Sequence, residues 1–588
     1  MGLLLCATEQ DVVARPRYAA TTFHKSEYWR TGSLKAEIAA MSYSDINDHH
    51  IANNAGPTVF HTIPFAETLL RGAQSHPERD CIVLLDERVT YGELAQRAQL
   101  AGRALMALGI ERGDRVGILM ANCLDFTDML FGASLIGAVP VLYNARFKAR
   151  EIAHITNDAG VKVVMTNDIV EQHTDYVALL DEADIHSSPL LDAAVFLGTG
   201  SRDGFVDRDA FYDLAAQVDQ AAVDARHADT QVDDIALMFY TSGTTAMPKG
   251  CPLTHVVLQH AGVVGGVDRF GLVEADVMWG PLPMFHSAFT QPLSGTLHVG
   301  GTYVSMTHFE PGDALNQIKR EGVTVAFPAF PTITLQLLNH ERYTPDTLRS
   351  VRVMLNVGPP EELVAMQQQM PHTTQITAFG MSECGGSVCI CDPADSIERR
   401  TACSGTALPG IEIEIRDPES GETLQPGAQG EIVARGRGVF SGYYNDPIKT
   451  AESFYDDGWF RTGDLGSMDS GGCVTFRGRL KDMLKVGGEN VAAVEVEGFL
   501  ATHPAVNLAQ VVPLPDAKYG EVPVAFVELL TGESASEQEI IDFCRGQIAG
   551  FKVPRHVRFV DEWPMGATKI LKYELRDRIC DELGRAKP

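Results

Sequence analysis

A loop rich in hydroxyl groups and glycine, near the middle of the chain, has the composition of a polyphosphate-binding site. It reads Tyr-Thr-Ser-Gly-Thr-Thr-Ala-Met-Pro-Lys from 240 to 249. Its backbone N–H groups, hydroxyls and single lysine are the donors and the cation that a polyphosphate requires. The apolar run 235–239 predicts a buried strand before the loop, and Thr254 is a candidate N-cap after it, so we expect the loop to join a strand to a helix. It is not a Walker A loop, because the Gly-Lys-Ser/Thr ending is absent; the alternative is a surface turn.

Three further segments carry residue types that suit nucleotide chemistry. They are Phe-Gly-Met-Ser-Glu at 379–383, Gly-Trp-Phe-Arg-Thr-Gly-Asp-Leu-Gly at 458–466, and a stretch rich in Gly and Lys at 478–490. A glycine such as Gly488 allows a ligand to approach the backbone closely, although a simple turn would also explain it.

The four segments, in this order, resemble the signatures of the adenylate-forming superfamily, which includes acyl- and aryl-CoA synthetases, peptide-synthetase adenylation domains and beetle luciferases. The resemblance covers residues 60–580. It implies an acyl-CoA synthetase that uses ATP and Mg²⁺ to make an acyl-adenylate and then forms a thioester with CoA. Two alternatives stay open: an acyl-AMP ligase that loads a carrier protein, and a non-catalytic sensor of nucleotides or acyl groups.

The resemblance also assigns residues to each part of ATP. The phosphates would be held by Thr241, Ser242, Gly243, Thr244, Thr245 and Lys249. The adenine and its surroundings would be contacted by Gly358, Phe379, Gly380, Met381 and Ser382. Asp464 and Arg479 would contact the ribose, and Glu383 with Thr245 would hold Mg²⁺.

The catalytic lysine is expected near the end of the chain. The family shows Pro, four residues, Gly and then Lys, whereas the run here is Pro564-Met-Gly-Ala-Thr-Lys569, with one residue missing and Thr568 in place of the glycine. The residues that follow match the family's register, so the resemblance assigns Lys569, and not Lys572, to the carboxylate and the α-phosphate. His286, in Pro-Met-Phe-His-Ser, resembles a residue that lies near the carboxylate.

The acid and CoA are expected at two further places. The acyl pocket is predicted at His286, Ala288, Phe289, Phe330, Thr332, Val357, Gly385 and Gly386. The resemblance places a hinge at Lys481 and a CoA tunnel at Lys485, Gly487, Gly488 and Glu489. Most of the pocket residues are apolar or small, so a fatty, aryl or alicyclic acid is expected. The two prolines at 359–360 depart from the family's usual sequence.

Alternating strand and helix patterns, which begin near residue 60, predict an α/β fold. We expect a large N-terminal domain at 53–479, made of two doubly wound αβ subdomains and a small β-rich subdomain. A small, mobile α+β C-terminal domain would follow at 480–588. Residues 1–52 are polar without periodicity and are expected to form an extension that is either disordered or a loosely docked arm.

Composition narrows the range of partners. Lys and Arg total 48 against 77 acidic residues, a net charge of −29, which argues against nucleic acid or an anionic membrane as a main partner. No run predicts a spanning helix or a signal peptide, and 11 cysteines suit reduced thiols in the cytoplasm. Cys384, Cys389, Cys391 and Cys403 lack paired zinc-ligand spacing, so no metal is expected there. The oligomeric state stays open, with a homodimer as one alternative.

Overall fold

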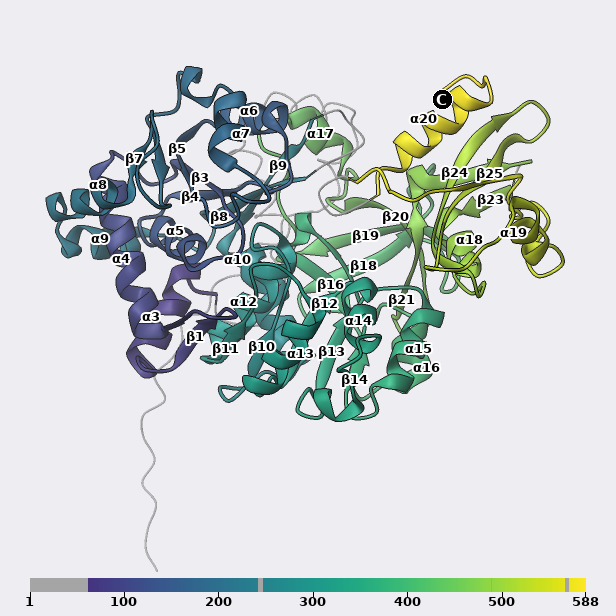
Figure 1. Cartoon of the computed structure of the whole chain (residues 1–588), viewed down its shortest axis with the longest axis horizontal. Helices are drawn as coiled ribbons and strands as arrows, with labels where there is room; N and C mark the ends of the chain where they lie inside the picture. The colour runs from purple at the N-terminus through teal and green to yellow at the C-terminus, as the bar shows by residue number, and fades with distance from the viewer. Residues whose placement is uncertain (1–61, 242–246, 488, 566–569, 588) are drawn as a thin grey trace, which may run out of the picture.

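The computed structural model describes residues 62–241, 247–487, 489–565 and 570–587. The predicted N-terminal extension, 1–52, therefore lies outside the described residues. In Figure 1 the chain passes from the first αβ layers at the left to a C-terminal unit at the upper right, where α20 (Lys572–Glu582) lies beside β24 and β25. None of the helices within the described ranges is long and apolar enough to cross a membrane.

The first αβ subdomain is built on a seven-stranded sheet in the order β7-β6-β5-β3-β4-β8-β9. All its pairs are parallel except β8 with β9. Its apolar strands are buried on both faces, as parallel strands covered by helices require. The strands are β3 (Arg115–Leu119), β4 (Val139–Leu142), β5 (Val161–Thr166), β6 (Ala193–Phe196), β7 (Val206–Asp207), β8 (Ile235–Thr241) and β9 (Lys249–Thr254). Its main helices are α4 (Tyr91–Ala107), α5 (Leu124–Leu135), α6 (Ala149–Asp158) and α9 (Gln220–Asp229).

The second αβ subdomain has another seven-stranded sheet, ordered β14-β13-β12-β10-β11-β1-β2. Only the β1–β2 pair is antiparallel. The strands are β1 (Asp80–Val83), β2 (Arg88–Thr90), β10 (Val277–Trp279), β11 (Thr302–Val304), β12 (Val325–Ala329), β13 (Val353–Asn356) and β14 (Thr374–Ile376). The helices that precede these strands or lie between them along the chain include α3 (Phe65–Ser75), α10 (His255–Gln259), α12 (Ser287–Val299), α13 (Pro311–Arg320), α14 (Pro331–Leu338) and α15 (Pro360–Gln369).

Two small antiparallel sheets continue the large domain. One contains β15 (Ala378–Met381), β16 (Gly386–Ile390) and β17 (Thr406–Ala407), with α16 (Ile397–Ala402) between the last two. The other contains β18 (Ile411–Arg416), β19 (Gln429–Gly436), β20 (Phe460–Met468) and β21 (Val474–Arg479). The second of these sheets is the predicted β-rich subdomain, so this part of the fold prediction is confirmed.

The C-terminal unit has its own sheet and its own two hydrophobic clusters. Its strands are β22 (Met483–Val486), β23 (Glu489–Ala492), β24 (Val506–Asp516), β25 (Gly520–Leu529) and β26 (His556–Phe559), and its helices are α18 (Ala493–Leu500), α19 (Glu537–Cys544) and α20. A 3-10 turn, Leu480–Asp482, separates it from β21. Helix α18 begins at Ala493 because the preceding residues, 489–492, pair with β22 as strand β23.

The prediction of reduced thiols is wrong for one pair, because Cys403 and Cys473 form a disulfide. Cys384, Cys389 and Cys391 are free and buried. No group of three or more His, Cys, Asp or Glu able to hold a metal occurs in the part of the chain that the structure describes.

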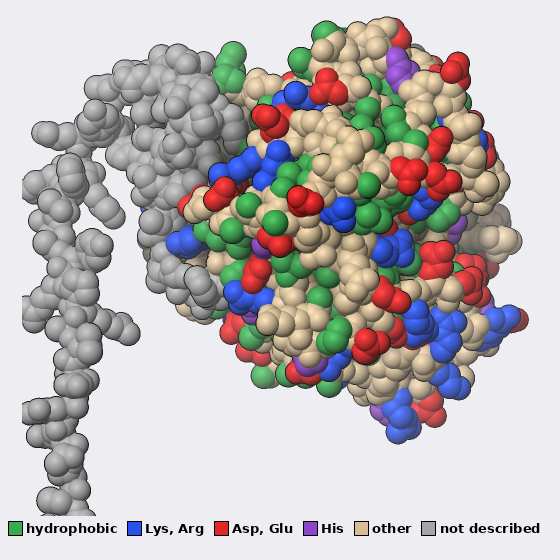
Figure 2. Space-filling view, turned by 90° about the vertical axis from the view of Figure 1, so that its left-hand side faces the viewer, with side chains coloured by type: hydrophobic (Ala, Val, Ile, Leu, Met, Phe, Trp, Pro, Cys, Tyr) green, Lys and Arg blue, Asp and Glu red, His purple; other side chains and the backbone are tan. Residues whose placement is uncertain are grey.

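Charges of both signs are interspersed on one face of the molecule (Figure 2). The face shown in Figure 2, on which α8 (Arg208–Asp213) and α9 lie, mixes acidic with basic side chains.

Candidate nucleotide and acyl site

The hydroxyl-rich loop joins two antiparallel strands and not a strand to a helix, which corrects the prediction. Thr241 at the end of β8 pairs with Lys249 at the start of β9. Residues 249–254 form a strand because they complete the edge of the parallel sheet, a pairing that local patterns do not show. The N-cap prediction is confirmed, since the Thr254 hydroxyl accepts a hydrogen bond from Val257 N. Ser242, Gly243, Thr244 and Thr245 lie outside the described residues.

Lys249 and Glu383 meet at a residue that sequence reasoning missed, Tyr443. The Tyr443 hydroxyl donates to Glu383 Oε1 at 2.8 Å, and Lys249 Nζ lies 5.8 Å from the centroid of the Tyr443 ring. Burial, and then the charge of Glu383, raises the pKa of the Tyr443 phenol, so it stays a donor. Burial, and then the charge of Lys449, lowers the pKa of Lys249. A cation and a carboxylate, each partly buried, thus both lie beside the Tyr443 side chain.

The segment 440–444 brings these groups together. Phe440 N donates to the Glu383 carbonyl at 2.8 Å, and Tyr444 N donates to the Gly250 carbonyl at 2.9 Å. A side chain at Gly250 would place its Cβ 2.9 Å from Tyr444 Cβ, so this approach needs glycine. In the sequence, the adjacent tyrosines 443–444, between the motifs at 379–383 and 458–466, were the signal that could have indicated a role for this segment.

Asp464 and Arg479 lie opposite each other on β20 and β21. Arg479 Nε is 3.0 Å from Asp464 Oδ1, and the Asp464 carboxylate is 4% exposed while the Arg479 side chain is 41% exposed. The arginine therefore neutralises a carboxylate that the fold buries, while part of its guanidinium faces solvent. This geometry suits contact with a ribose hydroxyl and a phosphate.

Phe379 has an aromatic partner that sequence reasoning missed. Its ring stacks on Phe476 of β21, with centroids 5.9 Å apart and planes 24° apart. Phe379 is 6% exposed and Phe476 is 37% exposed, so Phe476 presents the more open ring of the pair. Gly380, next on β15, would clash with the Gly386 carbonyl at 2.1 Å if it carried a Cβ. Met381 is half-buried, and Ser382 begins the 3-10 turn Ser382–Cys384 that carries Glu383.

Helix α12 contacts both His286, at its N-terminus, and the Gly385–Gly386 segment, through Gln291. His286 is the N-cap, and its Nδ1 accepts from Ala288 N at 3.1 Å. Gln291, one turn further along α12, accepts from Ser387 N at 3.0 Å. A Cβ on Gly386, whose φ is +138°, would lie 2.2 Å from Gln291 Oε1. The absence of a side chain at Gly386 therefore lets the backbone of this segment approach Gln291 on helix α12 closely.

The other predicted acyl residues lie in two different environments. Phe330 and Val357 are 37% and 43% exposed, Thr332 is exposed, and Val357 N donates to the Ala329 carbonyl at 2.7 Å. Gly358 packs so closely that a Cβ would meet Pro331 Cγ at 2.5 Å. Phe289, by contrast, is fully buried, and its ring contacts Phe126 and Tyr303 edge-on.

The predicted CoA residues lie at the tip of the β22–β23 hairpin. Lys485, Gly487 and Glu489 are exposed, and Gly487 has a φ of +62° that favours glycine. Lys481 lies in the turn between the large domain and this hairpin. Gly488 and Lys569 lie outside the described residues. Lys572, the alternative catalytic lysine, has its Nζ 2.5 Å from Glu497 Oε1.

A polar cavity of about 780 Å³ lies elsewhere, at the carboxyl ends of β3, β5 and β6. Asp125, Asn167 and Arg208 are among its lining residues. None of the residues predicted for ATP, acid or CoA lines it.

Known families and structures match most of this architecture. A family model described as AMP-binding enzyme matches residues 69–444, and one described as AMP-binding enzyme C-terminal domain matches residues 495–569. The chain belongs to the AMP-binding enzyme family. The Bacillus subtilis (strain 168) protein YngI is 34% identical over 528 residues, which are 87% of this chain and 96% of its own. A 4-coumarate–CoA ligase of Oryza sativa subsp. japonica is 30% identical over 562 residues, 93% and 97% of the two chains.

The solved structures agree with the sequence relatives. The anthranilate CoA ligase AuaEII, in complex with anthranoyl-AMP, is similar with a TM-score of 0.80 and 26% identity over 90% of this chain and 99% of its own. ATP-bound MatB from Rhodopseudomonas palustris has a TM-score of 0.76 and 28% identity over 88% and 99% of the two chains. The α/β fold with a large N-terminal and a small C-terminal domain is thus confirmed, as is the enzyme class, an AMP-forming acid–thiol ligase.

Proposed function

We propose that the enzyme activates a hydrophobic carboxylic acid with ATP and Mg²⁺ and transfers the acyl group to CoA. The observation that carries this proposal is the meeting of Lys249, Tyr443 and Glu383 beside the loop between β8 and β9. It supplies a cation for phosphate oxygens and an acidic ligand for a cation that bridges them.

Glu383 fits the role of a magnesium ligand. Mg²⁺ is commonly held by one or two carboxylates together with substrate phosphates, and Glu383 is a carboxylate oriented by a buried phenol. When bound, Mg²⁺ would neutralise charge on the leaving pyrophosphate. Thr245 is proposed to add its hydroxyl, and Thr241 and Lys249 contact the phosphates.

In the first half-reaction, a carboxylate oxygen of the acid attacks the α-phosphorus, and the bond to the bridging oxygen breaks so that pyrophosphate leaves. Lys569 is proposed to bring its ammonium to both anions, which lowers their repulsion. Lys572 is held by Glu497 on α18, which supports Lys569 as the inserting lysine. Asp464 and Arg479 hold the ribose, and Phe379 with Phe476 borders the adenine.

In the second half-reaction, the CoA sulfur attacks the carbonyl carbon and AMP leaves, while the thiol proton passes to solvent. The small domain, residues 480–588, is proposed to turn about Lys481 and present the tip of the β22–β23 hairpin. The exposure of Lys485, Gly487 and Glu489 supports this, because their side chains or backbone are open to a ligand.

The acid is proposed to be aryl or aliphatic and without a second charge. Phe330 and Val357 offer exposed apolar surface beside Gly358. Relatives with similar chains are named for coumarate, ferulate and anthranilate. Other relatives are named for medium-chain acyl groups and for fatty acyl-CoA, so aromatic and aliphatic acids are both classes to test.

The test is a mass-spectrometric screen of the purified protein with ATP, Mg²⁺ and a panel of aryl, fatty and alicyclic acids, with and without CoA. We expect AMP, pyrophosphate and acyl-CoA with one acid class. Adenylate without a CoA thioester would favour loading of a carrier protein. No turnover with any acid would contradict the proposal.

A further inference from the structure

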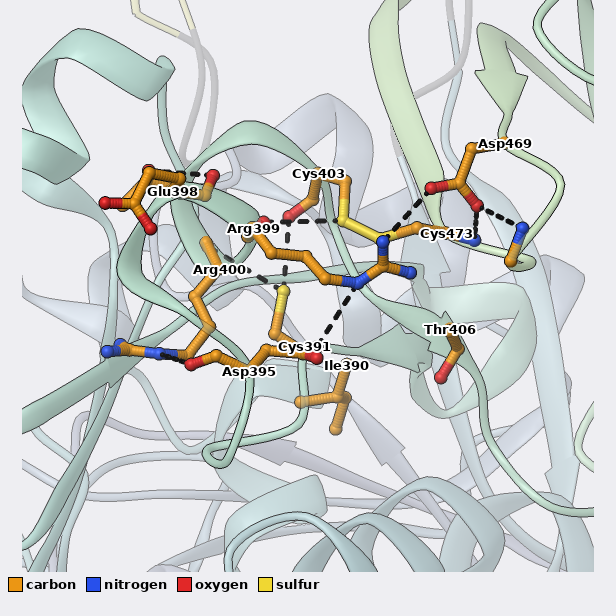
Figure 3. The surroundings of a disulfide bond; sticks show 12 residues. Ile390, Cys391, Asp395, Glu398, Arg399, Arg400, Cys403, Thr406, Asp469 and Cys473 are labelled. Atoms are coloured by element: carbon orange, nitrogen blue, oxygen red, sulfur yellow. Dashed lines mark hydrogen bonds and ion pairs between the residues drawn. A yellow bond between two sulfur atoms is a disulfide. The ribbon is translucent and has the colours of Figure 1, made fainter.

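A disulfide connects two segments that flank the nucleotide site. Cys403 follows α16, and Cys473 directly precedes β21, 70 residues later. Their Cα atoms are 6.2 Å apart, within the range that disulfides span without moving the backbone. In Figure 3 the Arg399 side chain runs alongside the disulfide toward Asp469, in the turn that leads to Cys473.

The disulfide connects the same two parts of the fold that also touch through Phe379 and Phe476, the residues proposed to border the adenine. Phe379 on β15 pairs with Cys389 on β16, and β16 pairs with β17 just after Cys403. On the other side, Phe476 lies three residues after Cys473, and its ring stacks on Phe379. Arg479, the partner of Asp464, lies at the end of the same strand. The disulfide therefore ties together the two sheets whose aromatic rings meet at this site.

We propose that Cys403–Cys473 is a reversible redox site, opened by dithiol reductants, whose closure holds Phe476 and Arg479 in place for nucleotide binding. The nucleotide part of this inference rests on the proposed function. In reduced compartments, disulfides that do form are commonly transient or redox-sensing.

The two sulfurs differ in access. Cys403 is partly exposed, whereas Cys473 is buried at 2% exposure. A thiolate of the dithiol attacks Cys403 Sγ, the protein S–S bond breaks, and Cys473 leaves as a thiolate that takes up a proton. The second thiol of the reductant then attacks the mixed disulfide and releases Cys403. Two electrons pass to the protein, and the dithiol becomes a disulfide.

The backbone keeps the segments paired after reduction. Ser404 N donates to the Val474 carbonyl at 2.7 Å, and Val474 N donates to the Gly405 carbonyl at 2.9 Å. The Arg399–Asp469 pair, 3.2 Å apart, is partly exposed and adds little. Both redox forms are therefore folded, and they differ in how tightly β21 is held.

Cys391 is a free thiol in contact with the Cys403 backbone and offers a matched control. Its Sγ donates to the Cys403 carbonyl at 3.2 Å, and the residue is fully buried. Burial raises the pKa of the Cys391 thiol to about 11, so at neutral pH it is protonated and a poor nucleophile toward the disulfide. Cys391→Ser keeps a donor at this place and leaves the disulfide intact.

The test begins with the full chain oxidised by glutathione disulfide or reduced by dithiothreitol. Peptide mapping after alkylation should find Cys403 linked to Cys473 before reduction and both alkylated after it. Reduction should lower the melting temperature by on the order of 5 °C and weaken AMP binding, measured by calorimetry, by about threefold. Both changes should reverse on reoxidation.

The double variant Cys403→Ser/Cys473→Ser should behave as the reduced protein and lose its response to dithiothreitol, whereas Cys391→Ser should keep that response. If the double variant does not fold, the redox titration of the unaltered chain decides. Alkylation of both cysteines in the oxidised protein, or equal AMP affinity in both redox forms, would overturn the inference. If neither redox form binds AMP, the proposed function is contradicted instead. The peptide map and the shift in melting temperature would then decide whether Cys403–Cys473 is a reversible redox site.

Discussion

The proposed nucleotide side and the proposed acyl side of this enzyme differ in the contacts that build them. On the nucleotide side, charged and polar side chains meet across elements, as in Arg479 with Asp464 and Tyr443 with Glu383. On the acyl side, backbone packs against backbone or helix, as at Gly386 beside Gln291. ATP has one chemistry, so its site needs particular residue types, whereas an acid's hydrocarbon part is selected by shape. Substitutions on the first side should therefore change rate, and those on the second should change which acid is used or how stable the fold is.

The largest effect is expected from Lys569→Ala. Removing the ammonium that meets both anions should slow adenylation by about 1000-fold, yet leave thioester formation from supplied acyl-adenylate nearly unchanged. Pyrophosphate release and single-turnover thioester assays measure the two steps. Lys572→Ala, which breaks only the pair with Glu497, is the control. Equal loss in both half-reactions would contradict the role of Lys569.

Asp464→Asn should rank second. It removes a charged acceptor for ribose hydroxyls and leaves Arg479 without its counter-charge, so kcat/KM for ATP should fall by about 100-fold. Steady-state kinetics at varied ATP and fixed acid measures this. Asp457→Asn is the matched control, because Asp457 forms an ion pair with Arg416 on a neighbouring part of the same subdomain. A similar loss in both variants would point to general destabilisation.

The variant Tyr443→Phe tests the contribution of the Tyr443 hydroxyl apart from that of its ring. The ring beside Lys249 remains, but Glu383 loses a hydrogen bond of 2.8 Å, so kcat/KM for ATP should fall by about tenfold. The Mg²⁺ concentration needed for half-maximal rate should also rise. Tyr455→Phe, which removes a similar bond to Glu431, should leave both values unchanged. A Tyr443→Phe enzyme with an unaltered Mg²⁺ dependence would separate Tyr443 from the metal.

Packing beside the acyl side predicts a dependence of stability on pH. His255 on α10 is buried, and its Nδ1 accepts from Phe65 N at 2.9 Å. Burial lowers the pKa of His255 to about 4 from an ordinary 6.5, so the unfolded chain binds the proton first as pH falls. The free energy of unfolding should therefore decrease between pH 6.5 and about 4, by up to about 1.4 kcal/mol per pH unit from this group.

His255→Asn keeps an acceptor for Phe65 N but cannot titrate. Urea unfolding at pH 7 and pH 5 should show a shallower pH dependence for this variant than for the unaltered chain. His372→Asn, at an exposed position, is the control. An unchanged pH dependence in His255→Asn would mean that other groups cause the acid sensitivity.

The smallest effect is expected from Val357→Ala on the acyl side. Loss of exposed apolar surface should raise KM for the acid by about threefold, while KM for ATP stays the same. Val364→Ala, exposed on α15, should change neither value. A larger change in KM for ATP than in KM for the acid would remove the distinction between the two sides.

Much of the nucleotide side could be predicted from sequence because its residues occur in short, chemically defined runs. Glu383, Asp464 and Arg479 each lie in such a run, and the structure brings Asp464 and Arg479 together across adjacent strands. Tyr443 and Phe476 were missed because each contacts a residue far away along the chain. The acyl side was harder, since Phe289, one of the predicted pocket residues, is fully buried and packs against Phe126 and Tyr303.

By itself, the sequence determined the class of enzyme and the α/β fold, because its short motifs resemble those of a known family and its strand and helix patterns alternate along the chain. Only the tertiary structure decided that β8 and β9 pair antiparallel, that Tyr443 lies between Lys249 and Glu383, and that Cys403 pairs with Cys473. The physical reason is that edge pairing, burial and sulfur contact depend on segments distant in the chain, and these meet only when the sheets are assembled.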